Sequence, residues 1–198
     1  SLYQLYGPYG NLELTPEENA TAEFGFESHL LNKKLTINAV GFYREEENTF
    51  GFYYNSVTFE SFYMNIDGIY NAKGVEASVR YSLSERFNIG GNYTFTQVEE
   101  QLNRLIPKHK ANIDFSYKWN RGSFGMQYQF VDQRKDAYYD SNVWATQPVN
   151  LGAYQLVNSN LSYELLTNRL YIFGAVSNIL NEDFQEVIGY NTGGRNYK

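Results

Sequence analysis

Residues 111–119 read ANIDFSYKW, and apolar and polar residues alternate through this stretch without a break. Ala, Ile, Phe, Tyr and Trp occupy the odd positions, whereas Asn, Asp, Ser and Lys occupy the even positions between them. Successive side chains of a strand point to opposite faces of a sheet, so this stretch predicts a strand with one apolar and one polar face. FNIGGNYTFT at 87–96 and VEASVRYSL at 75–83 follow the same pattern.

Working outward from these stretches, we expect about eight strands and no competing segment of helical period. The expected strands span residues 20–31, 34–46, 68–83, 86–99, 108–119, 122–134, 152–166 and 169–179. Residues 170–177, LYIFGAVS, are apolar on both faces, so the register of the last strand stays open.

Two kinds of connection alternate along the chain. Short segments rich in turn-forming residues lie at 32–34, 84–86, 120–122 and 167–169. Longer polar or aromatic loops lie near 47–67, 97–107, 135–151 and 181–194. We therefore predict an all-β, antiparallel up-and-down sheet with short turns at one end and long loops at the other.

The composition excludes several classes of protein. The formal net charge is −6 and no basic cluster is visible, which argues against a nucleic-acid partner. The absence of cysteine excludes disulfides, thiolate metal sites and cysteine nucleophiles. The chain is rich in aromatic residues, with 19 Tyr and 14 Phe, yet no apolar run approaches the roughly 20 residues of a membrane-spanning helix. Any membrane contact must therefore be made by strands.

Alternation alone does not decide whether the apolar face lies inside a soluble barrel or outside a membrane barrel. Three features favour the membrane barrel. The strands reach the roughly 9 to 11 residues of a tilted transmembrane strand, and Phe115, Tyr117 and Trp119 suit an interfacial aromatic girdle. Short turns that alternate with long loops are the third feature. A soluble, small-ligand-binding β-barrel stays as an alternative.

Five blocks of sequence resemble the barrel of TonB-dependent outer-membrane receptors. The first is SLYQLYGPYGNLELTPE at 1–17, in which Gly10, Asn11, Leu14, Pro16 and Glu17 match a Gly-Asn-x-x-Leu-x-Pro-Glu pattern. The others are NAKGVEASVRY at 71–81, IPKHKANIDFSY at 106–117, VSNILNEDF at 176–184 and GYNTGGRNYK at 189–198. Lys108 stands where the family usually has Arg, and Gly193 stands where it usually has Pro. The blocks occur in the family's order and cover nearly all of the chain.

The resemblance implies an antiparallel, up-and-down transmembrane β-barrel. Receptors of this family have an N-terminal plug domain, a TonB-contacting segment and a barrel of about 22 strands. We therefore expect residues 1–198 to be a C-terminal portion of such a barrel, without the plug and with the closing strand truncated. Its open strand edges would allow the fragment to self-associate or to close on itself.

The resemblance also implies a function and a location. The expected function is TonB-dependent uptake of a scarce nutrient, such as a ferric siderophore or cobalamin, across the bacterial outer membrane. The expected partners are the TonB complex, reached through the missing plug, outer-membrane lipid and a small ligand. We expect no enzyme activity, catalytic residue, metal site or cofactor. A passive or structural outer-membrane barrel is a second alternative.

Aromatic residues in two long loops are the candidate ligand-binding residues, because large rigid rings give contact area at low entropic cost. They are Tyr53, Tyr54, Tyr138, Tyr139 and Trp144, and Phe59, Phe62 and Tyr63 extend the first group. The alternative is that these rings pack loop against loop, extend strands or line the membrane interface.

A row of polar residues on the expected strands is predicted to line the lumen, where rows of this kind hold the plug in the family. Its members are Asn88, Asn92, Thr94, Asp114, Ser116, Lys118, Asn158, Asn160 and Glu164. For other polar groups we expect a solvated or structural role rather than a site. These groups are His29, His109, the run Glu45 to Glu47, and the series Asp132, Asp136 and Asp140.

Overall fold

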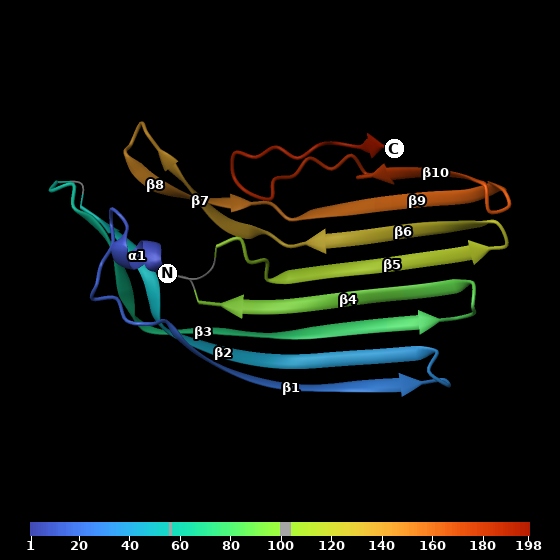
Figure 1. Cartoon of the computed structure of the whole chain (residues 1–198), viewed down its shortest axis with the longest axis horizontal. Coiled ribbons are helices and arrows are strands. Elements are labelled where there is room, and N and C mark those ends of the chain that lie inside the picture. The colour runs from blue at the N-terminus through green and yellow to red at the C-terminus, as the bar shows by residue number, and fades with distance from the viewer. Residues whose placement is uncertain (56, 100–103) are drawn as a thin grey trace.

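Nine antiparallel strands form the main sheet of the computed structural model, which describes residues 1–55, 57–99 and 104–198 (Figure 1). Their order in the sheet is β1-β2-β3-β4-β5-β6-β9-β10-β11, so neighbours in sequence are neighbours in space except where β7 and β8 intervene. The bounds are β1 Glu18–Leu30, β2 Leu35–Tyr54, β3 Ser61–Ser82, β4 Phe87–Val98, β5 His109–Trp119, β6 Gly122–Val131, β9 Tyr154–Leu166, β10 Leu170–Ser177 and β11 Asn196–Tyr197. The predicted all-β, up-and-down architecture is confirmed, and the eight expected strands are all present.

The register of the strands separates the polar side chains from the apolar ones. Residues directly opposite each other in an antiparallel pair point to the same face. Asn88 lies opposite Ser116, while Ile89 lies opposite Phe115, and Phe115 lies opposite Met126. One face of the sheet therefore carries mainly polar residues and the other mainly apolar ones, as the alternation predicts.

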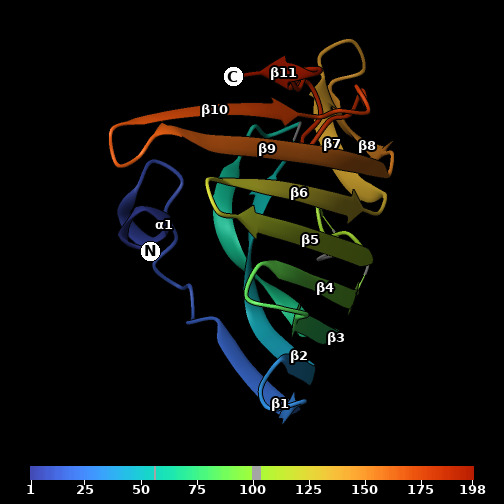
Figure 2. The ribbon, with the colours of Figure 1, turned by 90° about the vertical axis from the view of Figure 1, so that its right-hand side faces the viewer.

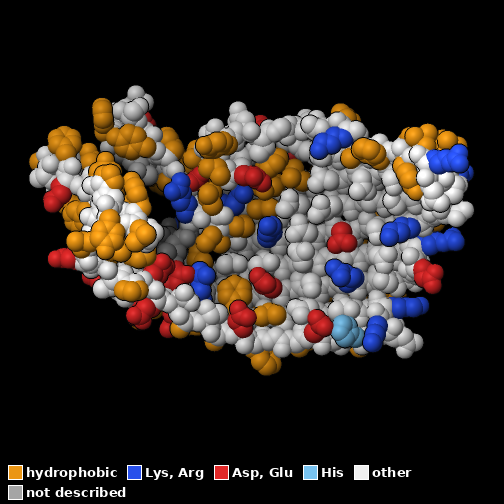
Figure 3. All heavy atoms as spheres, in the orientation of Figure 1, with side chains coloured by type: hydrophobic (Ala, Val, Ile, Leu, Met, Phe, Trp, Pro, Cys, Tyr) orange, Lys and Arg blue, Asp and Glu red, His pale blue; other side chains and the backbone are white. Residues whose placement is uncertain are grey.

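The sheet is curved and open, and its polar face lies on the inside of the curve (Figures 2 and 3). The outer edge of β1 has no strand partner among the described residues, and β10 is covered on its outer edge only near its end, where Val176 and Ser177 pair with β11. Few apolar side chains of the described residues are buried, and Phe24 on the apolar face is 83% exposed. No helix in the described part of the chain has the length and apolar character needed to cross a bilayer.

The prediction of a loop at 47–67 is wrong, because β2 and β3 continue through most of this segment as a long hairpin. The register shifts between Glu47 and Thr49, where Asn48 adopts a positive φ of 56°. A bulge of this kind interrupts the alternation from which strands are predicted. Residue 56 in this loop and residues 100–103 in the expected loop 97–107 lie outside the described residues.

Two further elements occur where we expected only turns and loops. A hairpin of β7 Arg134–Asp140 and β8 Ala145–Leu151 forms a separate two-stranded sheet within the expected loop 135–151. The first block contains a short helix, α1 Leu2–Tyr6, which begins with a capping box between Ser1 and Gln4. This helix packs beside the β2–β3 hairpin, where the ring centroids of Tyr3 and Tyr63 are 6.3 Å apart.

Close packing at Gly74 gives a test of the register between β2, β3 and β4. A methyl group at this position would overlap the Phe95 carbonyl oxygen and lie 2.6 Å from Cζ of Phe42. We expect Gly74→Ala to lower the free energy of unfolding of the complete receptor in detergent by about 1–3 kcal/mol, as overpacking does. The matched control is Gly152→Ala, where an added methyl group meets nothing within 4 Å. Equal urea midpoints for the two variants would contradict the register.

Candidate functional site

The predicted polar row lies on one face of the main sheet. Asn92 lies opposite Asn112, Asp114 lies opposite Gln127, and Gln127 in turn lies opposite Asn158. The remaining members, Asn88, Thr94, Ser116, Lys118, Asn160 and Glu164, fall on the same face by alternation along their strands. Figure 3 views this face and shows scattered charged groups among other polar side chains and backbone. That these residues line a lumen stays a prediction.

Two hollows on the polar face are lined by members of the row. The first has a volume of about 380 Å³ and includes Asp114, Ser116, Asn158 and Asn160. The second has a volume of about 470 Å³ and adds residues of the preceding strands to Asn92 and Asp114. Asp114 borders both, which places it centrally among the polar groups of this face.

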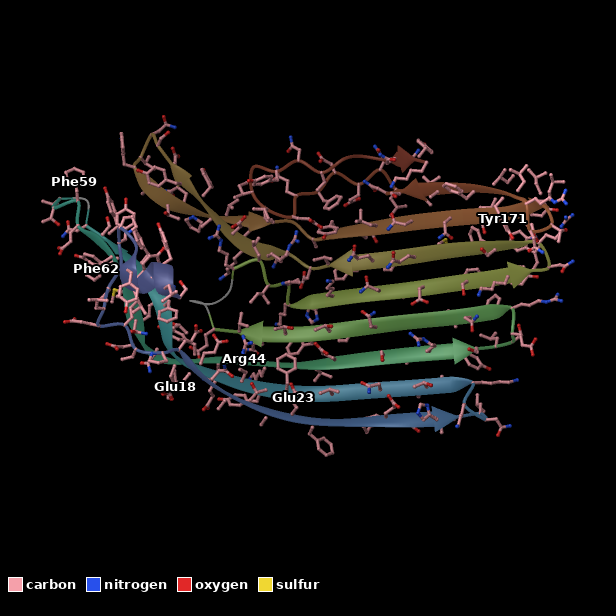
Figure 4. The ribbon with its side chains drawn as sticks, viewed as in Figure 1. Glu18, Glu23, Arg44, Phe59, Phe62 and Tyr171 are labelled. Carbon is pink, nitrogen blue, oxygen red and sulfur yellow. The ribbon has the colours of Figure 1, made fainter. Side chains whose placement is uncertain are left out.

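The polar face also contains charged residues that the prediction did not include. Glu27, His29 and Arg80 line the second hollow. The Nε2 atom of His29 lies 2.9 Å from Glu27 Oε1, and its Nδ1 atom lies 3.1 Å from Thr36 Oγ1. A third hollow of about 490 Å³ lies near Glu23 and Arg44, whose positions Figure 4 labels. The alternation of polar and apolar residues that predicts β4 and β5 continues into β1 and β2. The same pattern therefore could have assigned these charged residues to the polar face.

Glu164 is a member of the predicted lumen row, but its carboxylate also makes two hydrogen bonds to nearby residues. Its Oε1 accepts hydrogen bonds from the Asn168 amide and from the hydroxyl of Tyr171, the latter at 3.1 Å. Asn168 lies in the turn between β9 and β10 with a φ of 55°. Glu164 therefore stabilises this turn, at the end of the sheet where Figure 4 shows Tyr171.

The candidate aromatic residues form two groups on separate hairpins. Tyr53 on β2 stacks on Phe62 of β3 with a centroid distance of 4.9 Å, and Tyr54 is exposed beside them. Figure 4 shows Phe59 and Phe62 toward the tip of this hairpin, far from the short turns. The β2–β3 hairpin and the N-terminal segment together form a cluster of four rings, in which Phe52 contacts Tyr9 and Tyr63, and Tyr63 contacts Tyr3.

The second group is more open to solvent. Tyr138 and Tyr139 lie on β7, and Trp144 lies in the turn that joins β7 to β8. Trp144 is 79% exposed, and none of these three rings contacts another aromatic ring among the described residues. The two hairpins stand apart at the loop end of the sheet (Figure 1). The structure thus brings the candidates to one end of the molecule, in two groups on separate hairpins (Figure 1).

Asp136 is not the solvated residue that we expected. It is 3% exposed, and its carboxylate accepts three hydrogen bonds. The Ile188 amide donates to Oδ2 at 2.9 Å, while the Ala137 amide and Arg104 Nε donate to Oδ1 at 2.8 and 2.9 Å. These contacts join β7 to two segments distant in sequence. Chiefly through the Ile188 amide, they lower the pKa of Asp136 from its ordinary value, although burial alone would raise it.

Arg134 makes a second connection between the β7–β8 hairpin and the segment after β10. Its Nη2 atom donates to the Gln185 carbonyl at 2.9 Å, and its guanidinium lies 4.9 Å from the centroid of the Tyr154 ring. Tyr154 in turn packs against Phe184 at a centroid distance of 4.3 Å. The β7–β8 hairpin is therefore held by polar and aromatic contacts rather than by pairing with the main sheet.

The remaining polar groups make local contacts within the part of the chain that the structure describes. Among the described residues, no three or more His, Cys, Asp or Glu side chains are grouped so that they could hold one. Glu45 accepts a hydrogen bond from the Tyr43 hydroxyl, and Glu46 pairs with Arg44 at 2.6 Å. His109 lies on the apolar face, where its Nδ1 is 2.7 Å from the Tyr93 hydroxyl. These contacts agree with structural roles.

A family model described as "TonB dependent receptor-like, beta-barrel" matches residues 1–179. The vitamin B12 transporter BtuB of Vibrio cholerae serotype O1 is 28% identical over 207 aligned residues, which cover 100% of this chain and 31% of BtuB. The chain thus spans about a third of the length of this curated relative.

Solved structures share the fold at lower sequence identity. The Pseudomonas aeruginosa receptor FpvA, bound to an iron pyoverdine, matches with a TM-score of 0.77 at 19% identity over 93% of this chain and 26% of FpvA. The ferric-catecholate import receptor Fiu of E. coli matches with a TM-score of 0.72 at 19% identity over 94% of this chain and 27% of Fiu. These likenesses show the barrel fold, and the chain corresponds to about a quarter of each receptor.

The Asp136 contacts predict a pH dependence at the β7–β8 hairpin. Because the folded-state pKa is lowered, the carboxylate stabilises this contact at pH values above the unfolded-state pKa of about 3.9. That stabilisation is lost as the pH falls through the lower, folded-state pKa. Hydrogen exchange at the Ile188 amide, measured against pH, is expected to accelerate relative to its intrinsic rate in this acid range.

Removing the carboxylate gives the matching test at neutral pH. We expect Asp136→Ala to accelerate exchange at Ile188 by about tenfold or more, because the amide loses a charged acceptor. The control is Asp140→Asn at the other end of β7, where the carboxylate accepts only from Asn142 among the described residues. Unchanged exchange in Asp136→Ala would contradict the role assigned to this carboxylate.

Proposed function

Because the chain belongs to the TonB-dependent receptor β-barrel family, which is located in the bacterial outer membrane, we propose that it forms part of the wall of a nutrient receptor. The receptor takes up a scarce small molecule, either an iron chelate such as a ferric siderophore or a cobalamin-like compound. This chain contributes strands, the loop-end hairpins and part of the lumen surface. The family consists of transport receptors rather than enzymes.

The observation that carries this proposal is the placement of the two faces. The polar face lies on the inside of the curve (Figures 2 and 3). The register places the apolar face on the opposite, outer side, where rings such as Phe24 are exposed. A soluble binding barrel needs the opposite placement, with its apolar face inside. A bilayer covers the exposed apolar face and leaves the polar face wetted.

Two features support active uptake over a passive or structural barrel. The polar face is a row of hydrogen-bonding and charged groups, and rows of this kind hold a plug in the complete family members. The relatives are described as a vitamin B12 transporter and a ferric-catecholate import receptor, and both descriptions imply a specific ligand that is bound and transported. In the complete receptor, the TonB complex acts through the plug rather than through the residues of this chain.

The loop-end aromatic residues are our candidates for ligand contact. Tyr138, Tyr139 and Trp144 are exposed, and Trp144 lacks a ring partner among the described residues, so these side chains are available to a ligand. Tyr53 and Tyr54 form a second wall on the β2–β3 hairpin. A siderophore or corrinoid presents extended faces against which such rings can pack.

Uptake assays with the complete gene test the function. Cells that carry it are expected to accumulate either radiolabelled iron chelates or cobalamin, and to lose this accumulation when tonB is deleted. Accumulation that persists without TonB would favour the passive barrel. A protein that is recovered monodisperse without detergent would favour the soluble barrel.

Truncation of the exposed rings tests their role in binding. We expect the triple variant Tyr138→Ala, Tyr139→Ala and Trp144→Ala in the complete receptor to bind the transported ligand at least about tenfold more weakly, a typical effect of losing aromatic anchors. The control carries Phe24→Ala and Phe26→Ala on the apolar face, where ligand binding should not change. Equal affinities of the triple variant and the unmodified receptor would rule out ligand contact by these rings.

A further inference from the structure

The short turns of the main sheet carry a concentration of positive charge. Four turns join β1 to β2, β3 to β4, β5 to β6, and β9 to β10 at one end of the sheet, and each contains at least one basic residue (Figure 1). We call these residues the basic turn rim: Lys33, Lys34, Arg86, Arg121 and Arg169. Glu85 is the single acidic residue within these turns.

The positive charge of the rim contrasts with the chain as a whole, whose formal net charge is −6. Lys and Arg side chains gather at the turn end in Figure 3, while acidic side chains are prominent toward the other end. The loop end contains, among others, Glu45, Glu46, Glu47 and Glu60. Charge is therefore distributed unevenly along the strand direction, with the positive charge at the short turns.

The rim is not used in ion pairs within the described part of the chain. Lys33, Lys34, Arg86 and Arg169 are exposed, and none of the five side chains forms a salt bridge with another described residue. Arg121 is held in place instead. Its Nη2 atom donates to Thr167 Oγ1 at 3.1 Å and approaches the Leu165 carbonyl at 3.5 Å, so its charge lies between two neighbouring turns.

The rim directly adjoins the apolar face. Leu30, Leu83 and Leu165 lie beside the turns, fall on that face by alternation and are exposed. Tyr117 stacks on Trp119 at the end of β5, with a centroid distance of 5.9 Å. Aromatic residues mark the membrane interface in outer-membrane barrels. The basic side chains therefore begin where the apolar band ends, at the depth of the lipid headgroups.

We propose that the basic turn rim binds the phosphate groups of anionic phospholipids in the leaflet that faces the short turns. Short turns of outer-membrane barrels lie on the periplasmic side, so this is the inner leaflet of the outer membrane. Basic residues next to a membrane-spanning segment attract anionic lipid headgroups. The rim follows successive turns along the edge of the sheet, next to lipid-facing leucines. Because the charges are spread along this edge, a lipid leaflet is a better fit as the binding partner than a compact acidic protein is. The proposal needs the membrane location but not the identity of the nutrient.

Lipid retention by the complete receptor tests the proposal. The receptor is purified in detergent, incubated with an equal mixture of phosphatidylglycerol and phosphatidylethanolamine, and analysed by native mass spectrometry. The variant K33Q/K34Q/R86Q/R169Q removes four exposed charges and leaves Arg121 in its hydrogen bonds. We expect the ratio of retained phosphatidylglycerol to phosphatidylethanolamine to fall by about fivefold or more. A fivefold change in lipid binding corresponds to the loss of about one basic side chain near an anionic leaflet.

A control variant removes the same number of charges away from the rim. K73Q/K108Q/R195Q/K198Q changes four exposed basic residues outside the short turns and is expected to keep the lipid ratio of the unmodified receptor. An unchanged ratio in the rim variant overturns the proposal, and so does an equal fall in the control. If the rim variant does not fold, K33Q/K34Q in the first turn is measured in its place. Ligand uptake is assayed in parallel, so a failure of lipid binding is distinguished from a failure of the receptor function.

Discussion

Inside a bilayer, every backbone amide and carbonyl must find its hydrogen-bond partner within the protein. In this chain the antiparallel ladder from β1 to β10 supplies those partners without using the side chains. The side chains are therefore free to differ between the two faces, and the alternation in sequence assigns one face to lipid and the other to polar contacts. The same constraint applies at the outer edge of β1, where pairing with a further strand is required once the edge lies in lipid.

Much of this arrangement can be predicted from the sequence, because the alternation of side chains along a strand involves residues that are close together in the chain. ANIDFSYKW and its neighbours predict strands, face assignment and turns, since each depends on residues one or two positions apart. The β2–β3 extension was missed because the bulge at Asn48 breaks the period. Helix α1 was missed because its five residues are too few to show a helical repeat. In both cases the sequence pattern is too short or too interrupted to predict the element.

The candidate site could be predicted only in part, for a related reason. The polar row shares a face because alternation determines orientation, and charged residues such as Glu27 and Arg80 extend it. Asp136 was expected to be solvated, because its spacing from Asp132 and Asp140 resembles that of an exposed series. Its burial depends on Arg104 and Ile188, which lie in other segments of the chain. Contacts of that kind arise from the path of the loops, which carries no periodic signal in the sequence.

The position of the β7–β8 hairpin between β6 and β9 has a consequence for how the chain folds. The other neighbouring strands from β1 to β10 are consecutive in the sequence, whereas β6 and β9 are separated by the intervening hairpin. The hairpin pairs Arg134 with Leu151, close to the point where Val131 meets Tyr154. Once the hairpin has formed, the ends of β6 and β9 are already near each other, and the entropy lost in closing the loop is small. The sheet can then assemble between neighbours throughout, and its folding rate is not limited by a single distant encounter.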